Sequence, residues 1–291
     1  MPISIGCGQI TWPRGTDDTT LLSEIAAAGY AGAPISRQTD ETPAALLMRY
    51  AAHGLRPAPG YYSADFWDPA QRATILAQAE DQARFAAACG VDALYVAANG
   101  FGYQTRSGQP RHALAGHVGA DDGLNAAEMQ QFAETLNAFA AITLAAGVRS
   151  CFHNHVGTPI ETGAEIDALL ALTDPALLFL GPDTGHLAWG GSDPLAFCRA
   201  HASRIMTIHL KDIDAAVAAR GRAEGWGYGQ TQDQAVWVEL GQGAVDFPAI
   251  FTVLRDADFA GWAIVETDVT QLPNALESAR VSRAYLQQLG H

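Results

Sequence analysis

Residues 125–155 read NAAEMQQFAETLNAFAAITLAAGVRSCFHNH and contain the repeating unit of the fold. The stretch begins as an Ala-rich run with the apolar spacing of a helix. It then reaches Gly147, which can adopt the positive φ at which a helix ends. Residues 148–155 (VRSCFHNH) have the length of one buried strand, along which side chains alternate. The stretch therefore predicts a helix and then a strand whose His153 and His155 point to the same face.

The same alternation of strand and helix runs from one end of the chain to the other. Gly29, Gly54 and Gly90 are expected to end further helices, and each is followed within a few residues by the next strand. We expect eight strands, at residues 3–9, 31–36, 55–62, 92–98, 148–155, 177–183, 205–211 and 262–267. Eight such units with right-handed crossovers predict an α/β fold, a single (β/α)8 TIM-barrel domain over residues 1–291. A doubly wound open sheet is the alternative, but no GxGxxG motif follows the first strand.

The composition excludes several classes of partner. The formal net charge is −14, from 31 acidic and 17 basic residues, and no run of Lys or Arg could neutralise nucleic-acid phosphates. No stretch approaches the ~20 apolar residues of a membrane span, and the start of the chain does not resemble a signal peptide. The 4 cysteines are too scattered for a zinc site or a disulfide framework. We therefore expect a cytoplasmic protein that binds neither nucleic acid nor membrane.

Two connections are longer than the others, residues 99–124 and 212–245. Loops that follow the strands of such a barrel surround its C-terminal mouth, so both are expected to line or cover a substrate site. In the second connection, residues 241–243 (Gly-Gln-Gly) are expected to shape a tight turn rather than to hold a phosphate. His112 and His117, in the first connection, are expected at the surface, although the loop could bring one of them over the site.

Polar and charged side chains stand at the ends of four successive predicted strands. They are His153, Asp183, His209 and Glu266. Inward side chains of neighbouring barrel strands converge on one axis, so these four can share a divalent ion. Their mixed nitrogen and oxygen atoms suit Mn²⁺, Co²⁺, Fe²⁺ or Zn²⁺ better than Ca²⁺ or Mg²⁺. Each residue alone also has a structural interpretation, since a single strand-end His is commonly hydrogen-bonded structure and Asp-Thr-Gly can simply be a turn before a helix.

Other residues near the predicted mouth are candidates for contact with a substrate. Lys211 shares the face of His209, whereas Asp212 points away from it. Asn99, at the end of the fourth strand, is a further candidate. Aromatic side chains could form an apolar wall against a sugar ring, or they could pack in the core; these are Trp12, Tyr61, Tyr62 and Phe66.

Several stretches resemble the xylose isomerase-like superfamily of sugar isomerases and epimerases, and within it the inosose dehydratases of inositol breakdown. The matching stretches, in the family's order and spacing, are FHNHVGTPIETGAEIDALLALTDP, DTGHLAWGGSDPLAF, RIMTIHLKDID, LGQGAVDFPAIF and GWAIVE. The first half of the chain matches more loosely, through GQITW. The resemblance implies a TIM barrel with one divalent metal at its mouth, often manganese or cobalt. It also implies a keto-polyol as substrate, and barrels of this group often form homodimers.

The residues around His153 bear on the type of reaction. Many isomerases and epimerases of the superfamily carry Glu-Asn-His where this chain has residues 153–155, His-Asn-His. In the epimerases, carboxylates of the fifth and eighth strands face each other across the substrate, and a metal-bound imidazole cannot replace the missing base. The resemblance therefore favours a metal-dependent dehydratase, a lyase, acting on a keto-inositol such as 2-keto-myo-inositol. A ketose isomerase or 3-epimerase is the alternative.

The dehydratase interpretation assigns roles to particular residues. The reaction would remove the proton α to a ketone and then expel the β-hydroxyl, with a Lewis-acid metal. Glu266 and Lys211 are candidates for the base and for the partner of the carbonyl or hydroxyl, His186 for the acid, and His155 for contact with substrate or water. The second strand ends in GAPIS, where the dehydratases are expected to carry an acidic residue, so another keto-polyol could be the substrate. A binding protein with a vestigial site and an abasic-site nuclease fit less well, the latter because it needs a basic surface.

Overall fold

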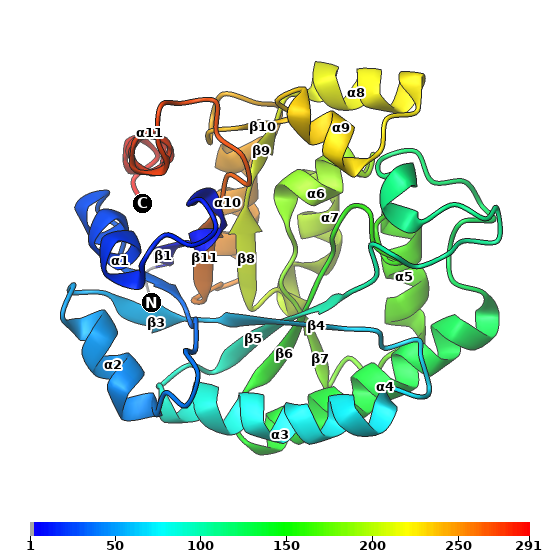
Figure 1. The fold of residues 1–291 in the computed structure, drawn as a ribbon, viewed down its shortest axis with the longest axis horizontal. Coiled ribbons are helices and arrows are strands. Elements are labelled where there is room, and N and C mark those ends of the chain that lie inside the picture. Colours follow the sequence, from blue (N-terminus) through cyan, green and yellow to red (C-terminus); the bar gives the residue numbers. More distant parts are fainter. Residues whose placement is uncertain (1–2) are drawn as a thin grey trace.

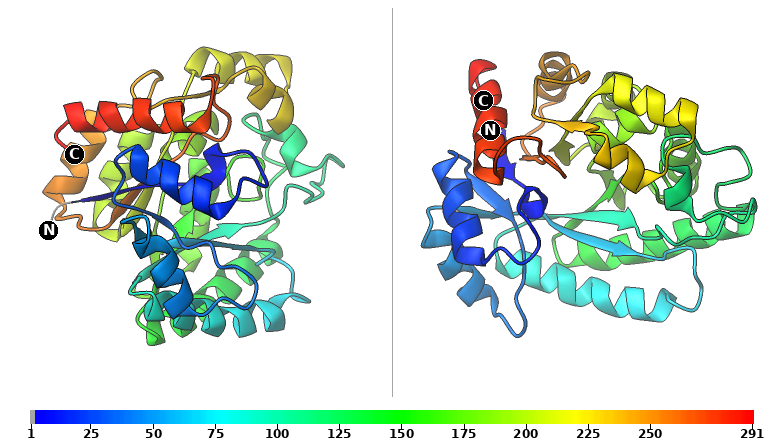
Figure 2. Two further views of the ribbon diagram at one scale, coloured as in Figure 1. Left: turned by 60° about the vertical axis from the view of Figure 1, so that its left-hand side comes forward. Right: turned by 45° about the horizontal axis from the view of Figure 1, so that its top comes forward.

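Parallel strands occupy the centre of the molecule and helices surround them, as Figure 1 and Figure 2 show for the computed structural model, which describes residues 3–291. One sheet has the strand order β3-β2-β1-β11-β8, and the other has the order β4-β5-β6-β7. The pairing of β1 with β11 brings the first and last strands side by side. These strands are β1 (Ser4–Cys7), β2 (Gly32–Pro34), β3 (Arg56–Ala58), β4 (Gly60–Ala64), β5 (Ala93–Ala98), β6 (Arg149–His153), β7 (Leu178–Leu180), β8 (Thr207–Leu210) and β11 (Trp262–Val265).

The two sheets join at two places. The first is Pro59, which separates β3 from β4, so that one segment of chain supplies an edge to each sheet. Proline has no N–H to donate to a continuous ladder. At the other junction, isolated parallel bridges pair Leu180 with Ile205 and Asp183 with His209. The predicted TIM barrel is confirmed, but the prediction of one unbroken strand over 55–62 is wrong.

The helices cover the outside of the barrel. They are α1 (Asp18–Ala27), α2 (Pro43–Ala51), α3 (Arg72–Ala88), α4 (Ala126–Ala145), α5 (Gly163–Leu172), α6 (Thr184–Trp189), α7 (Pro194–His201), α10 (Phe247–Asp256) and α11 (Ala275–Gln288). The helix predicted before Gly147 is α4, which begins with a reciprocal capping box between Asn125 and Glu128. Gly147 and the three other predicted helix-ending glycines all have positive φ. No helix within residues 3–291 has both the length and the apolar character that crossing a membrane requires.

The two long connections lie together on the outside of the barrel mouth. Residues 212–245 contain α8 (Ala215–Glu224) and α9 (Tyr228–Asp233). An antiparallel pair that was not predicted, β9 (Asp212–Ile213) with β10 (Trp237–Val238), closes this insertion. Residues 99–124 contain a single short 3-10 turn, Arg111–Leu114, which contacts α9. In Figure 1 both insertions lie toward the upper right.

Two separate layers of side chains surround the strands. Between the second sheet and α3 and α4, Phe66 packs against Phe132, and Tyr62 stacks on Phe139 with ring centroids 4.8 Å apart. Tyr62 and Phe66 therefore belong to the core, where burial stabilises the fold by roughly 1.5–3 kcal/mol per large side chain. Inside the barrel, Tyr95 forms a smaller cluster with other buried residues, which are Ala58 and Ile264.

Candidate metal centre

The four predicted ligands lie at the carboxyl ends of neighbouring strands. His153 is the last residue of β6, and His209 lies within β8. Asp183 follows β7 and is the N-cap of α6, while Glu266 comes directly after β11. The bridge between Asp183 and His209 and the parallel pairing of β8 with β11 place these residues at one level of the barrel. The fold thus brings all four residues together.

The possible ligand atoms are close enough to share one ion. Asp183 Oδ2 lies 3.9 Å from His153 Nε2 and 3.7 Å from His209 Nδ1. His209 Nδ1 is also 3.1 Å from Glu266 Oε2. Atoms of His153, Asp183 and His209 all lie within 4.8 Å of one another, and all three residues are buried.

Several polar atoms of this group are buried without a hydrogen bond. They are His153 Nδ1, Asp183 Oδ2 and both ring nitrogens of His209. The other oxygen of Asp183 is engaged, because it accepts the backbone N–H of His186 at the start of α6. A buried polar atom without a partner costs about 1–3 kcal/mol. One ion can bind only one nitrogen of each ring. Asp183 Oδ2 and His209 Nδ1 are the unpaired atoms that face each other, and they fit a divalent transition-metal ion, which would satisfy both.

The charges in this group are strongly coupled. Burial, together with the neighbouring His209, lowers the pKa of His153 well below its usual value, so its ring is neutral and keeps a lone pair. Burial opposes the charge of His209, but the carboxylates of Glu266 and Asp183 outweigh it and raise the pKa of His209 to about 9. Burial likewise opposes ionisation of Glu266, yet the cations of His209 and Lys211 lower its pKa to about 2.

Lys211 completes the group as a buried cation. Its Nζ lies 2.7 Å from Asp268 Oδ1, 3.1 Å from Glu266 Oε2 and 3.4 Å from Asp183 Oδ2. Burial opposes the ammonium charge, but these carboxylates outweigh it and hold the pKa of Lys211 well above its usual value. Lys211 is therefore a hydrogen-bond donor in this site and is poorly suited to act as a base.

Asp268 was missed by the sequence analysis, although it stands only two residues after Glu266. It forms a second group with His155 and His186, in which the ligand atoms lie within 4.8 Å of one another. The rings of His155 and His186 overlap, with centroids 3.8 Å apart. Tyr228, from the long insertion, donates its hydroxyl to Asp268 Oδ2 at 3.2 Å. The two-residue spacing from Glu266 could have predicted that Asp268 points to the same side, whereas no local pattern predicts a role for Tyr228.

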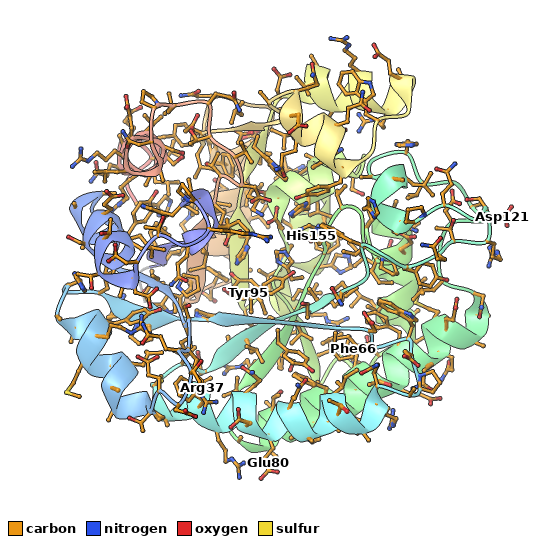
Figure 3. All side chains as sticks on the ribbon, viewed as in Figure 1. Arg37, Phe66, Glu80, Tyr95, Asp121 and His155 are labelled. Atoms are coloured by element: carbon orange, nitrogen blue, oxygen red, sulfur yellow. The ribbon has the colours of Figure 1, made fainter. Side chains whose placement is uncertain are left out.

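A cavity of about 360 Å³ lies over both groups. Its lining includes Tyr61, whose ring meets His153 edge to face at 5.1 Å, and Tyr95, which forms part of the floor. Figure 3 shows Tyr95 and His155 near the axis of the barrel. His186 is fully buried and is not among the lining residues, which include His153, His155, His209, Lys211, Glu266 and Asp268.

Two residues predicted to bind substrate lie outside this cavity. Trp12 lines an adjoining outer cleft, and its Nε1 donates to Glu24 at 2.7 Å, because the ring packs against α1. Asn99 lines a side pocket that it shares with Tyr61 and His155. The structure therefore places neither Trp12 nor Asn99 beside the metal ligands.

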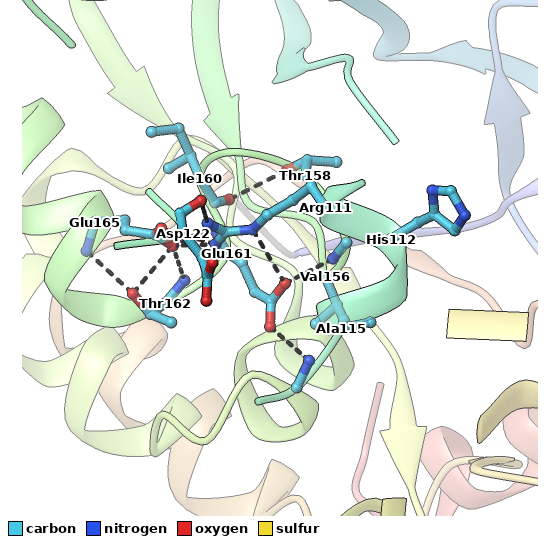
Figure 4. A network of polar contacts seen from close by, with 12 residues as sticks. Arg111, His112, Ala115, Asp122, Val156, Thr158, Ile160, Glu161, Thr162 and Glu165 are labelled. Atoms are coloured by element: carbon cyan, nitrogen blue, oxygen red, sulfur yellow. Dashed lines mark hydrogen bonds and ion pairs between the residues drawn. The ribbon is translucent and has the colours of Figure 1, made fainter. Parts of the chain in front are cut away.

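A buried ionic network ties residues 99–124 to the segment after β6 (Figure 4). Arg111 donates to both carboxylate oxygens of Glu165, at 2.7 and 2.8 Å, and to the backbone oxygen of Asp122. Glu161 accepts backbone N–H groups from Gly116 and Gly157, each at 2.7 Å. The same loop carries Phe101, whose ring contacts Tyr228 and His155 at the mouth.

A second anchor holds residues 212–245. The buried carboxylate of Asp212 accepts the backbone N–H groups of Gly241, Gly243 and Val245, at 3.0, 2.9 and 3.0 Å. Residues 241–243 thus form a turn around a carboxylate, as the sequence analysis expected. Asp212 points away from the cavity that Lys211 lines.

Residues 22–289 match the family model of the xylose isomerase-like TIM barrel. The chain belongs to this family. An inosose dehydratase from Geobacillus kaustophilus is 29% identical over 299 residues, covering 100% of this chain and 96% of that relative. Among solved structures, the probable 3-DHS dehydratase AsbF from Bacillus anthracis has a TM-score of 0.72 at 17% identity, covering 98% of this chain and 99% of that chain. The IolI protein with a bound zinc atom has a TM-score of 0.70 at 15% identity, covering 99% and 98%.

The match to the xylose isomerase-like family includes every strand end that carries a predicted ligand, because it extends from α1 into α11. The resemblance predicted from the sequence stretches is therefore confirmed. At 15–17% identity the two solved structures support the barrel fold. The residues of the site have to be argued from the geometry of this chain.

Proposed function

We propose that this member of the xylose isomerase-like family is a metal-dependent dehydratase acting on a keto-inositol such as 2-keto-myo-inositol. Relatives that align over nearly their full length and are named inosose dehydratase support this reaction class. The observation that carries the proposal is the buried group of His153, Asp183 and His209, whose ligand atoms lie within 4.8 Å of one another, with Glu266 Oε2 3.1 Å from His209 Nδ1. Mn²⁺ and Co²⁺ are the first candidates, and Zn²⁺ and Fe²⁺ follow; the zinc atom of the IolI protein supports a divalent ion in a barrel of this shape.

The proposed mechanism begins with removal of the proton α to the ketone. The four ligands would hold the ion, which when bound supplies Lewis acidity toward the ketone oxygen. Glu266 lines the cavity and is ionised, so it is the candidate base. Its cationic neighbours make Glu266 a weak base. The reaction therefore requires that the C–H bond α to the ketone be made more acidic.

Loss of the β-hydroxyl then needs a proton donor beside the leaving group. Lys211 lines the cavity and keeps its proton, whereas His186 lies behind it, with Nε2 3.3 Å from Lys211 Nζ. By position, Lys211 is thus better placed than His186 to protonate the departing hydroxyl, and its raised pKa makes the ammonium a weak acid, as its cationic neighbours make Glu266 a weak base. His186 would position the ammonium, and His155 and Tyr61 would contact the polyol ring from the cavity wall.

The alternative is a ketose isomerase or 3-epimerase, of which the epimerase requires acid–base groups on opposite faces of the substrate. Both carboxylates that line the cavity, Glu266 and Asp268, come from the end of β11. Two strands away around the barrel from β8, β6 contributes the imidazole of His153 instead. This one-sided arrangement favours elimination over inversion.

The test is turnover of 2-keto-myo-inositol by purified protein loaded with Mn²⁺ or Co²⁺. We expect an absorbing enone or dione product with the wild-type protein and none with Asp183→Asn. Exchange of deuterium into C3 of fructose or tagatose with inversion would instead support the epimerase. Absence of elimination with every keto-polyol tried, in protein shown to hold one metal ion, would overturn the proposal.

A further inference from the structure

A second set of metal-binding residues shares the barrel mouth with the four proposed ligands. His155, His186 and Asp268 offer atoms within 4.8 Å of one another. His186 is fully buried, and Asp268 Oδ1 is buried without a hydrogen bond of acceptable geometry. Two imidazoles and a carboxylate have the composition of a second divalent site.

The ammonium group of Lys211 contacts two members of this second set. Its Nζ is 2.7 Å from Asp268 Oδ1 and 3.3 Å from His186 Nε2. It also reaches Glu266 and Asp183, which belong to the first set, at 3.1 and 3.4 Å. We propose that the Lys211 ammonium occupies the position of a second divalent cation and thereby limits the mouth of the barrel to one metal ion.

Charge balance supports this assignment. Three carboxylates surround Lys211 Nζ, those of Asp183, Glu266 and Asp268. One divalent ion together with one ammonium neutralises them, whereas two divalent ions beside Lys211 would leave an excess of positive charge in a buried site. Lys211 itself is only 3% exposed, so its ammonium depends on these carboxylates for the solvation that it has lost.

The identity of this cation changes what the site can do. A second metal ion would add another Lewis acid and would clamp two substrate oxygens. An ammonium in the same place offers N–H donors and a transferable proton beside the cavity. The inference rests on the proposed metal centre and extends it from the choice of ligands to the number of ions.

Metal counting on a matched pair of variants tests the inference. Lys211→Ala removes the charge and empties the space, so we expect two Mn²⁺ ions per chain after equilibrium dialysis, against one in the wild type. Lys211→Met removes the charge but keeps an unbranched side chain in that space, so one ion is expected. The double variant Lys211→Ala with Asp268→Ala should return to one ion. Electron paramagnetic resonance of the Mn²⁺-loaded Lys211→Ala protein should show exchange-coupled ions.

Each outcome bears on a different statement. One ion in Lys211→Ala, or two in the wild type, overturns the inference and leaves the proposed centre intact. A wild-type protein that retains no ion overturns the proposed centre, and with it the inference. Circular dichroism establishes that each variant is folded, and Lys211→Ser provides the same test if the Ala variant is insoluble.

Discussion

Two buried groups of charged residues include side chains at or after the end of β6, and they differ in how their polar atoms are paired. In the network around Arg111, both terminal nitrogens of the guanidinium donate hydrogen bonds, to Asp122 and Glu165, and both oxygens of Glu161 accept backbone N–H groups. In the group around Asp183, buried atoms of His153, Asp183 and His209 have no hydrogen bond within residues 3–291. Apart from Arg111 Nε, these atoms of the first group are satisfied within the chain, whereas the second group leaves atoms that a bound ion would satisfy.

This difference separates a structural cluster from a functional one more clearly than burial or charge does. Arg111 and Asp183 are equally inaccessible to solvent, at 0% exposed each. Arg111 Nε, 3.9 Å from Glu161 Oε2, is the one buried nitrogen of that side chain without a hydrogen bond. A chain that leaves several such atoms unpaired on neighbouring strands gives up stability, and a bound ion would restore it.

The largest expected effect comes from removing a charge in the unpaired group. Asp183→Asn keeps an oxygen for the N–H of His186 but weakens the hold on the ion, so kcat/KM should fall by roughly 10³-fold or more, equivalent to about 4 kcal/mol. The unfolding free energy of the metal-free protein should change little, because Asp183 is one of three carboxylates that surround Lys211 Nζ and repel one another. Metal content by mass spectrometry and urea unfolding in a chelator check both parts. If the variant keeps its metal ion but loses stability, the role of Asp183 is structural, like that of Arg111.

The second effect concerns the satisfied network and should appear in stability. Arg111→Met leaves Glu165 Oε1 and the backbone oxygen of Asp122 without their donors, and breaking a buried ion pair in this way costs about 3–5 kcal/mol. Arg106→Met is the matched control in the same loop. Its ion pair with Asp121 is exposed, and such pairs contribute about 0–1 kcal/mol. Equal urea-unfolding free energies for the two variants would contradict the distinction between the buried ion pair of Arg111 and the exposed ion pair of Arg106.

The residues that sequence reasoning found are those marked by local pattern. Strands alternating with Ala-rich helices predicted the barrel, and polar residues at strand ends predicted His153, Asp183, His209 and Glu266, because parallel strands bring their carboxyl ends together. Lys211 was predicted to share the face of His209, because side chains two residues apart along a strand point to the same side. These features need no knowledge of the loops.

The residues that it missed depend on contacts between distant segments. Tyr228 reaches Asp268 across 40 positions of the chain, and Arg111 reaches Glu165 across 54. Neither contact follows from periodicity, because long insertions can cross a barrel mouth in many ways. Trp12 illustrates the converse, since an aromatic residue near a strand end found its partner in α1 rather than in the substrate cavity.

The smallest expected effect is a dependence of the unfolding free energy on pH, which arises from Glu161 in the network around Arg111. Burial raises the pKa of Glu161 from 4.5 to about 7, and the partly compensating influence of Arg111 and of two backbone N–H groups does not cancel it. The folded protein therefore binds a proton at Glu161 more tightly than the unfolded chain does. The stabilisation is fully present below pH 4.5 and is lost as the pH rises through 7, by at most about 3 kcal/mol.

Unfolding free energies of the wild type and Glu161→Gln at pH 5 and pH 8 isolate this contribution. The variant is expected to be less stable at both values, because its amide presents one N–H group to backbone donors that need an acceptor. Its stability should nevertheless fall less between pH 5 and pH 8 than that of the wild type, because the titrating group is gone. An equal fall in unfolding free energy between pH 5 and pH 8 for both proteins would mean that Glu161 stays ionised beside Arg111. The network would then carry a permanent extra negative charge, as the group around Asp183 does.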